Sequence, residues 1–133
     1  MKEINKITYH EIPQLSRTIQ NLKSYMNKRP FLSQFVDSTL LEELDHETVE
    51  LLYAKTVLLI ETKIESLIEE RTGETKIPVG TKVTMRFDFN EDLRAGDEAE
   101  IEKVGRFEEN TFGYGWYYYM IKGCQIYRNE FEI

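Results

Sequence analysis

The last third of the chain, residues 79–133, constrains the fold more than any other part. Between residues 81 and 89 apolar side chains alternate with polar ones, which is the period of a β-strand with one buried face. The following residues predict an acidic loop at 90–94, a turn at 95–97, a strand at 98–104, a polar loop at 105–113, an aromatic strand at 114–121, a turn at 122–123 and a returning strand at 125–133. Short strands in this order predict a small closed β-barrel.

The first 73 residues predict helices. One apolar stripe has the three- and four-residue spacing of a helix over 12–27, and it consists of Ile12, Leu15, Ile19, Leu22 and Met26. Lys28, Arg29 and Pro30 are expected to close that helix. A second helix begins near Thr39 and extends to about residue 71, with a break near Asp45 and Gly73 as its C-cap. The expected fold is therefore α+β, with an antiparallel helical hairpin over 1–73 and a barrel over 74–133.

The second helix is apolar over more of its circumference than one partner helix would cover. We therefore expect it to contact the first helix on one side and either the barrel or a second subunit on the other. Because the helix is longer than a short first helix can cover, we expect a dimer through it. The residues expected at that interface are Leu52, Leu59, Ile60, Ile64 and Leu67.

The charge of the chain limits the partners that it fits. With 41% apolar and 31% charged residues, the composition is that of a globular protein, and its net charge is −7. This sign disfavours nucleic acid as a direct ligand, because binding to phosphates depends on Lys and Arg. A mild basic patch on the first helix contains Arg17, Lys23, Lys28 and Arg29 and is expected to be a solvated face.

From Val83 to the C-terminus, the sequence resembles a Src-homology-3-like barrel, a five-stranded fold. An aromatic segment of residues 87–89 precedes the acidic loop, and Trp116 begins the aromatic strand. The residues that match the turn after the acidic loop are Leu93, Gly96, Asp97, Glu98, Glu100 and Ile101, and those that match the end of the family pattern are Gly123, Ile126, Asn129, Glu132 and Ile133. The Pro and Tyr that help to form the peptide groove in that family are replaced by Tyr127 and Glu130, so the resemblance implies the fold more than the groove.

An aromatic and acidic binding surface is expected on this barrel. Its residues are Phe87, Phe89, Glu91, Asp92, Trp116, Tyr118 and Tyr127. Such a surface suits extended peptides or bases. The alternative is that the aromatic rings fill a small core. Because neighbouring residues of a strand face opposite ways, at least two rings of residues 116–119 must lie outside that core.

The sequence contains little that indicates catalysis. His10 and His46 are not spaced with other ligands as a metal site requires, and Cys124 has no histidine beside it. We therefore expect no enzyme activity, no metal and no cofactor. The single cysteine fits a reducing cytoplasm, and no apolar segment is long enough to act as a signal peptide or to span a membrane.

Three functions remain open at this point. The first is a non-catalytic module that binds a host or viral protein. The small, acidic chain resembles proteins of phages and mobile elements in style, and such a protein would inhibit or adapt a host machine such as a defence nuclease. The second is a structural protein that self-associates through its long helix, and the third is a nucleic-acid-binding adaptor.

Overall fold

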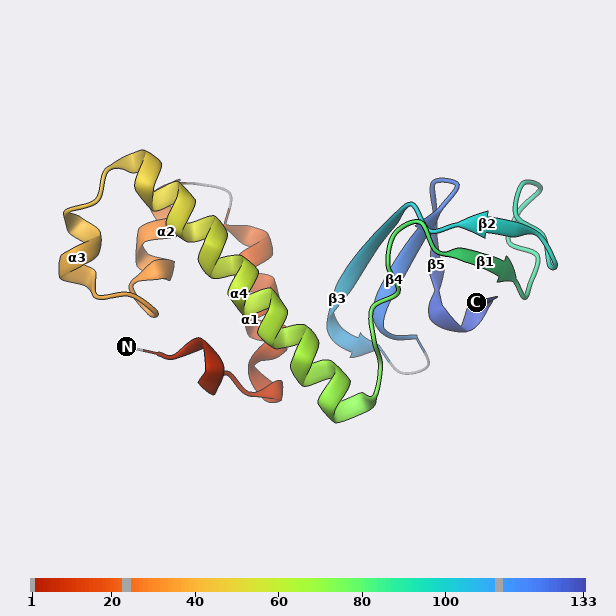
Figure 1. Cartoon of the computed structure of the whole chain (residues 1–133), viewed down its shortest axis with the longest axis horizontal. Helices are drawn as coiled ribbons and strands as arrows, with labels where there is room; N and C mark the ends of the chain where they lie inside the picture. Colours follow the sequence, from red (N-terminus) through yellow and green to blue (C-terminus); the bar gives the residue numbers. More distant parts are fainter. Residues whose placement is uncertain (1, 23–24, 112–113) are drawn as a thin grey trace. The chain divides into compact units, whose positions relative to one another are not determined.

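The computed structural model describes residues 2–22, 25–111 and 114–133. The chain is α+β: helices form its first part and strands its second (Figure 1). It divides into two compact units, Met1–Gly73 and Glu74–Ile133, each with a buried core.

The helical unit contains more and shorter helices than the sequence predicted. Its elements are η1 (Ile4–Lys6), η2 (Tyr9–Glu11), α1 (Ile12–Asn21), α2 (Tyr25–Leu32), α3 (Ser38–Glu42) and α4 (His46–Thr72). The single helix expected over 12–27 is therefore wrong. Leu22 leaves the helical conformation with ψ 79°, and α2 then contains Pro30 in its interior instead of ending before it.

Two capping residues define α4, which is the longest helix of this unit in the described residues. The carboxylate of Asp45 accepts the backbone N–H of Thr48 at 2.8 Å, and hydrogen bonds from the hydroxyl and N–H of Thr48 hold the pKa of Asp45 below its ordinary value. Gly73 has φ +78° and donates its N–H to the carbonyl of Glu69. The expected break at Asp45 and the expected C-cap at Gly73 are both present.

Polar contacts fix α2 inside the helical unit. The Arg29 guanidinium donates to the carbonyls of Leu41 and Leu44 at 2.5 and 2.7 Å, and Lys28 pairs with Glu50 at 2.6 Å. These two members of the expected basic patch therefore have partners within the unit, and Lys23 lies outside the described residues. The buried apolar side chains of the helical unit are Ile7, Ile12, Leu15, Phe31, Leu32, Leu41, Val49, Ile60, Ile64 and Ile68.

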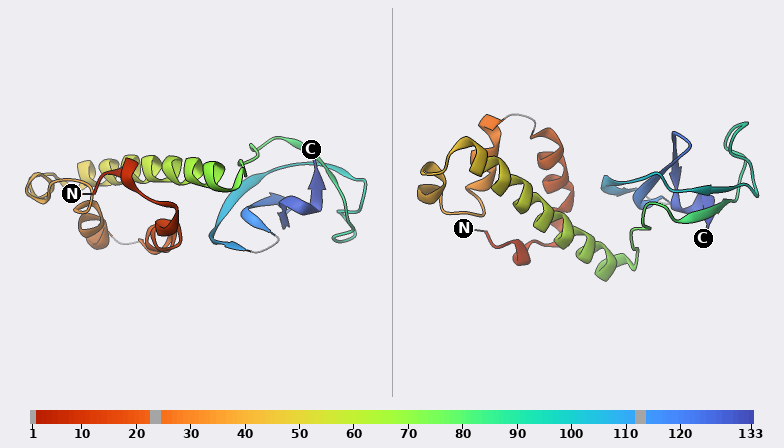
Figure 2. Two further views of the ribbon diagram at one scale, coloured as in Figure 1. Left: turned by 90° about the horizontal axis from the view of Figure 1, so that it is seen from below. Right: turned by 45° about the horizontal axis from the view of Figure 1, so that its top comes forward.

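Two antiparallel three-stranded sheets form the second unit. Their strands are β1 (Lys82–Met85), β2 (Glu98–Glu100), β3 (Lys103–Thr111), β4 (Gly115–Ile121), β5 (Cys124–Tyr127) and β6 (Phe131–Glu132). One sheet has the order β2-β1-β6 and the other the order β3-β4-β5. The chain crosses from the first to the second between β2 and β3, and the curved path of β3 is visible in Figure 2.

This arrangement differs from the expected five-stranded closed barrel. Six strands are present in the described residues, and no ladder there joins the two sheets into one closed barrel. The strand expected over 98–104 is interrupted at residues 101–102, and the polar loop expected over 105–113 is strand as far as Thr111. β3 pairs with β4 from Lys103 to Arg106 and again at Thr111, and the register shifts between these two parts.

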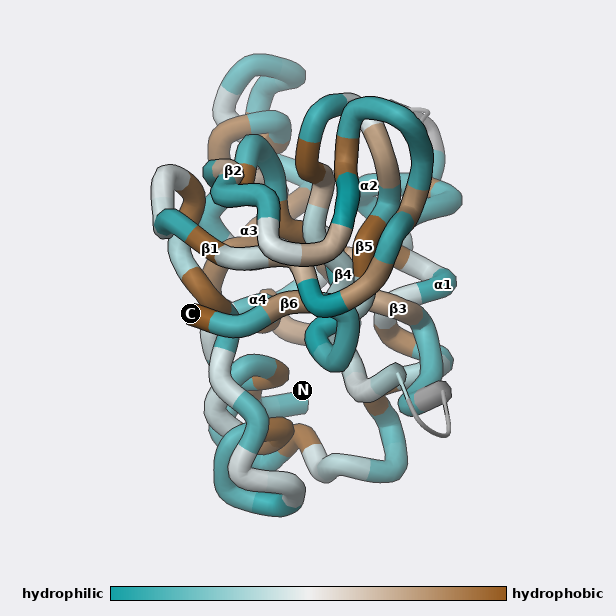
Figure 3. Tube along the Cα trace, turned by 90° about the vertical axis from the view of Figure 1, so that its right-hand side faces the viewer, coloured by the Kyte–Doolittle hydropathy of each residue, from teal (hydrophilic) through white to brown (hydrophobic). Residues whose placement is uncertain are grey.

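The core of the β-unit consists mainly of side chains that alternate along its strands, and hydrophobic stretches on β1 and β5 are visible in Figure 3. Tyr119 is fully buried, and its ring packs edge-on against Phe131 at 5.4 Å. Its hydroxyl oxygen accepts the backbone N–H of Ile77 at 3.3 Å. Burial raises the pKa of the Tyr119 phenol above its ordinary value. Tyr119 thus joins the segment before β1 to both sheets of this unit.

Candidate functional site

The loop between β1 and β2, residues 86–97, is ordered by its own hydrogen bonds. We call it the acidic loop. Leu93, at its centre, is fully buried and anchors it to the core of the β-unit. Short side-chain acceptors close successive turns within it. The Asp88 side chain accepts the backbone N–H of Ala95 at 2.9 Å, and the Asp97 side chain accepts that of Arg94 at 2.9 Å. The side-chain oxygen of Asn90 accepts the backbone N–H groups of Asp92 and Leu93 at 2.8 and 2.9 Å. The conformation of this loop is therefore set before any partner binds.

Two large aromatic side chains of the acidic loop lie in solvent. Phe87 is 59% exposed and Phe89 is 44% exposed. The sequence predicted that both would share one strand face with Val83 and Met85, which are buried. β1 ends at Met85, so the alternation stops there and the two rings turn outward. Covering the exposed part of each ring would gain about 1 kcal/mol.

The loop that holds these rings is acidic overall. Residues 86–97 contain four carboxylates and two arginines, and Glu91 and Asp92 are both exposed. One of the arginines, Arg86, lies 3.4 Å from a carboxylate oxygen of Glu132. A shallow hollow beside the ring of Phe89 is lined by the carboxylates of Asp88 and Glu91, by Asn90 and by Arg94. The acidic loop thus combines an apolar contact surface with a net negative charge.

A second aromatic surface lies on the β3-β4-β5 sheet. We call Phe107, Tyr114, Tyr118 and Tyr127 the aromatic face. The ring of Phe107 lies 5.1 Å from that of Tyr118 and 5.9 Å from that of Tyr127, and the rings of Tyr114 and Tyr127 are 4.2 Å apart. Tyr118 crosses β3 at Gly105, where an added Cβ would lie 2.5 Å from the Cε2 atom of the ring. Gly105 is thus the residue that lets this ring lie flat on the sheet.

The structure divides the aromatic binding surface that the sequence predicted. Tyr118 and Tyr127 are partners across β4 and β5. Phe87 and Phe89 belong to the acidic loop, and no ring contact among the described residues joins them to either tyrosine. Trp116 is only 2% exposed. Its ring therefore has almost no surface to offer a partner.

Sequence reasoning missed Phe107 and Tyr114 as members of a shared surface. The sequence predicts a polar loop around Phe107 because Gly105, Glu108 and Glu109 are poor strand formers. The available signal was the two-residue spacing from Gly105 to Phe107, which puts both on one face of a strand. Recognising that face also required knowing that Tyr118 lies opposite Gly105.

The backbone around Trp116 depends on a carboxylate from outside the sheet. Glu74 accepts the Trp116 N–H at 2.7 Å. Gly115, just before it, has φ +77°, and an added Cβ there would lie 2.6 Å from a carboxylate oxygen of Glu74. This contact fixes the start of β4.

The five residues predicted for a dimer interface do not share one accessible face. Ile60 and Ile64 are fully buried in the core of the helical unit, and Leu52 and Leu67 are half-buried. Leu59 is exposed, and Leu51 and Leu58 are exposed near it on α4. The apolar residues of α4 therefore pack mainly in the core of the helical unit.

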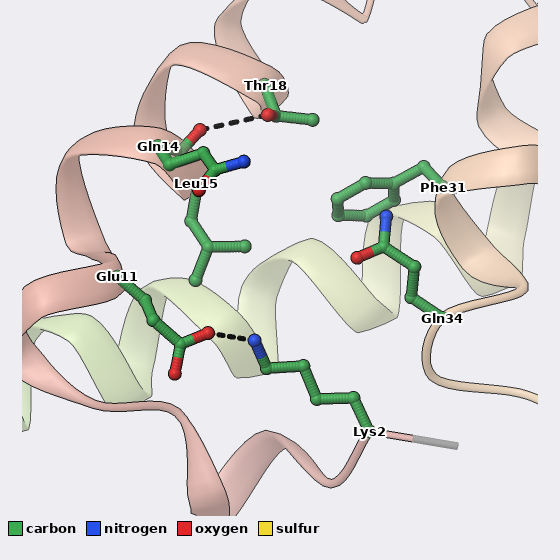
Figure 4. Close-up of a pocket in the computed structure, with 7 residues that line it drawn as sticks. All are labelled: Lys2, Glu11, Gln14, Leu15, Thr18, Phe31 and Gln34. Atoms are coloured by element: carbon green, nitrogen blue, oxygen red, sulfur yellow. Dashed lines mark hydrogen bonds and ion pairs between the residues drawn. The ribbon is translucent and has the colours of Figure 1, made fainter.

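Two further hollows among the described residues are small or open. In the helical unit a pocket of about 120 Å³ has Leu15 and Phe31 as its apolar part (Figure 4). The Lys2–Glu11 ion pair lies beside it, and the Thr18 hydroxyl donates to the carbonyl of Gln14. It is smaller than the pockets that hold most small-molecule ligands. A shallower hollow of about 470 Å³ lies between η2 and the end of α4.

The described residues contain no cluster of side chains that could hold a metal ion. Within residues 2–22, 25–111 and 114–133, no three His, Cys, Asp or Glu side chains gather as metal ligands would. Cys124 is half-buried, and its sulfur accepts the side-chain N–H of Asn90 at 3.3 Å. Of the helices in the described part of the chain, none is long and apolar enough to cross a membrane.

Comparison with known proteins adds no relative. No protein family matches the chain, and no curated protein or solved structure was found to be similar to it.

Proposed function

We propose that the chain is a non-catalytic protein-binding module whose acidic loop binds a segment of another protein that has Lys or Arg next to an apolar residue. Inhibition or adaptation of a host protein with a basic surface is a role that such a loop would serve. The observation that carries the proposal is the exposure of Phe87 and Phe89 on a loop that is already ordered.

We also propose a Src-homology-3-like fold for the β-unit. Three features support it. β1 pairs with both β2 and β6, the chain passes from β2 into β3 of the second sheet, and a 3-10 turn, η3 (Arg128–Glu130), stands between β5 and β6. In this reading β2 and β3 are the two halves of one bent strand, and the acidic loop is the long loop that flanks the peptide groove in that family.

The order of the loop supports a role in binding. A flexible loop loses conformational entropy when a partner fixes it, at about 0.5–1.5 kcal/mol for each side chain immobilised. The hydrogen bonds of Asp88, Asn90 and Asp97 have already restricted this loop. When a partner covers the two phenylalanines, the burial of their rings stabilises the complex, and little entropy is lost because the loop is already ordered.

The charges of the loop define the partner. Glu91 and Asp92 stand on the same loop as the two rings, so a segment with Lys or Arg next to an apolar residue fits both parts of the surface. Acidic segments would be repelled. The electrostatic part of this interaction should weaken as salt increases, because both carboxylates are exposed.

A peptide-display selection on the folded chain tests this proposal. We expect the selected peptides to contain an apolar residue beside Lys or Arg. We expect the double variant Phe87→Ala/Phe89→Ala to bind them at least about tenfold more weakly, since two ring contacts of about 1 kcal/mol each are lost. Val79→Ala, which also trims an exposed apolar residue of the β-unit, is the matched control and should bind as the parent does.

The same peptides separate the two parts of the surface. Glu91→Lys/Asp92→Lys should weaken binding mainly at low salt, whereas the phenylalanine variant should weaken it at every salt concentration. Equal binding by the parent and the phenylalanine variant would show that the acidic loop is not the site. Selection of acidic peptides would show that the partner chemistry is wrong.

A further inference from the structure

The shallower hollow of the helical unit is formed by two segments that lie far apart in the sequence. Its volume of about 470 Å³ is within the range of pockets that hold small molecules. η2 forms one wall and the last turns of α4 form the other, and these two elements contact each other (Figure 1). Both belong to the unit Met1–Gly73, so the hollow lies within one compact part of the chain.

The wall that α4 forms has an apolar part and a charged part. Leu67, Glu70 and Arg71 line it, and their spacing of three and four residues places them on one face of the helix. Leu67 is half-buried. Ile7, which precedes η2 and also lines the hollow, is 2% exposed. A ligand in this hollow would therefore meet an apolar surface beside the charged groups of Glu70 and Arg71.

The guanidinium of Arg71 contacts the ring of Tyr9. Its carbon Cζ lies 5.3 Å from the centre of that ring, in a cation–π contact. Tyr9 begins η2, whose start is fixed by a capping box in which the Glu11 carboxylate accepts the backbone N–H of Thr8 at 3.1 Å. Of the carboxylates in the described ranges, none lies within ion-pair distance of Arg71. The guanidinium is thus held in place by a ring and keeps N–H donors for a ligand.

We propose that this hollow binds a small-molecule carboxylate whose charged group is attached to a flat apolar body. The guanidinium of Arg71 donates two parallel N–H groups to the two oxygens of the carboxylate, which is the geometry that arginine and carboxylate share. The apolar body covers Leu67 and Ile7, which line the same hollow. The site lies in the helical unit, so its test is independent of the function proposed for the acidic loop.

Glu70 limits the charge of the ligand. Its carboxylate lines the same hollow as Arg71, so it repels a second negative charge on a bound molecule. A carboxylate carries a single negative charge at neutral pH, whereas a phosphate monoester carries nearly two. A neutral ligand of the same shape lacks the charge-assisted hydrogen bonds to Arg71. The site should therefore prefer a carboxylate to a phosphate and to a neutral amide.

Titration of the isotope-labelled full chain with naphthoate, followed by NMR, tests the proposal. We expect the backbone amide signals of Tyr9, Leu67 and Arg71 to shift and to saturate with a dissociation constant of about 1 mM or lower, as for a small ligand with one ion pair. Naphthalene carboxamide has the same apolar body without the charge and should bind about tenfold more weakly. Naphthyl phosphate should bind no more tightly than naphthoate.

Two pairs of variants assign the binding to this hollow. Arg71→Gln should weaken naphthoate binding about tenfold, whereas Lys55→Gln, which removes the same charge at another exposed position of α4, should leave it unchanged. Tyr9→Leu removes the ring that the guanidinium contacts and should weaken binding, and Tyr9→Phe keeps the ring and should bind as the parent does. Circular dichroism establishes that each variant is folded, and if Tyr9→Leu is not, the pair at Arg71 and Lys55 still decides the question.

Three results would overturn the proposal. The first is the lack of any saturable shift in the helical unit up to about 10 mM naphthoate. The second is a carboxamide or a phosphate that binds as tightly as naphthoate or more tightly. The third is a set of shifts that lies on the aromatic face of the β-unit and persists in Arg71→Gln, which would place the ligand on those rings.

Discussion

Gly105→Ala should destabilise the β-unit, and the same change should stabilise it once Tyr118 has been removed. The Tyr118 ring lies across Gly105, and the methyl group of alanine would come within 2.5 Å of its Cε2 atom, where ordinary contacts begin at 3.4 Å. The ring must therefore move by about 1 Å, which disturbs its packing on Phe107 at 5.1 Å. The three atoms nearest to the added methyl group all belong to the Tyr118 side chain.

The expected magnitude combines two opposing effects. Overpacking costs about 1–3 kcal/mol, and alanine recovers about 0.4–1 kcal/mol because it restricts the unfolded chain more than glycine does. The net effect of Gly105→Ala is a loss of about 1–2 kcal/mol. In Tyr118→Ala only the second effect remains, so Gly105→Ala should then stabilise by about 0.5–1 kcal/mol. The coupling between the two positions is thus about 2 kcal/mol.

Trp116 makes the measurement specific to this unit. It is the only tryptophan of the chain and is buried in the β-unit, so its fluorescence in urea follows the unfolding of that unit alone. The four chains of the double-mutant cycle are compared by their midpoints and slopes. If Gly105→Ala has the same sign and size with and without Tyr118, the ring does not lie over the glycine as described, and the assignment of the aromatic face is wrong.

Three further predictions concern single residues. Ile64→Ala should destabilise the helical unit by about 2–5 kcal/mol in thermal circular dichroism, whereas Leu58→Ala, at a site 66% exposed, should change its stability by less than about 0.5 kcal/mol. Asp45→Ala should lower the melting temperature of that unit near neutral pH, because it removes the carboxylate that caps α4. The pKa of Asp45 is lowered in the folded chain, so the stability that this carboxylate contributes is lost as pH falls through that pKa. Below it the parent and the variant should melt at the same temperature. The pKa of Tyr119 is raised above its ordinary value of 10.0, so the stability that its neutral phenol gives the β-unit should be complete below pH 10 and be lost as pH rises through the folded pKa. Tyr119→Phe should therefore show a smaller loss of stability at alkaline pH by Trp116 fluorescence. At neutral pH it should be less stable than the parent by about 1 kcal/mol, because the N–H of Ile77 then has no acceptor.

Local chemistry made several elements predictable. Asp45 and Gly73 set the two ends of α4, because a short acidic side chain satisfies the first N–H groups and glycine accepts a positive φ. Lys122 and Gly123 have φ 49° and 75°, the pair of positive angles that a two-residue hairpin turn requires, and a turn was expected there. Each of these signals depends on a few adjacent residues.

Features that depend on distant residues leave no local signal in the sequence. β3 was expected to be a loop after Gly105, since glycine is a poor strand former by itself. Its place in a strand depends on Tyr118, thirteen positions later, which fills the space above it. The outward turn of Phe87 similarly depends on the end of β1 at Met85, whose backbone bonds to Gly96 and Asp97.

The sequence alone determined the α+β class, the limits of α4 and the alternating strands, because periodicity and capping act within a few residues. It also determined that the aromatic residues and the carboxylates of the last third would be close along the chain. Only the tertiary structure decided which apolar residues would be buried. On α4 both Ile60 and Leu59 are hydrophobic, yet Ile60 lies in the core and Leu59 in solvent. Side-chain chemistry sets the tendency to leave water, but the position of neighbouring elements decides which side of a helix or strand can do so.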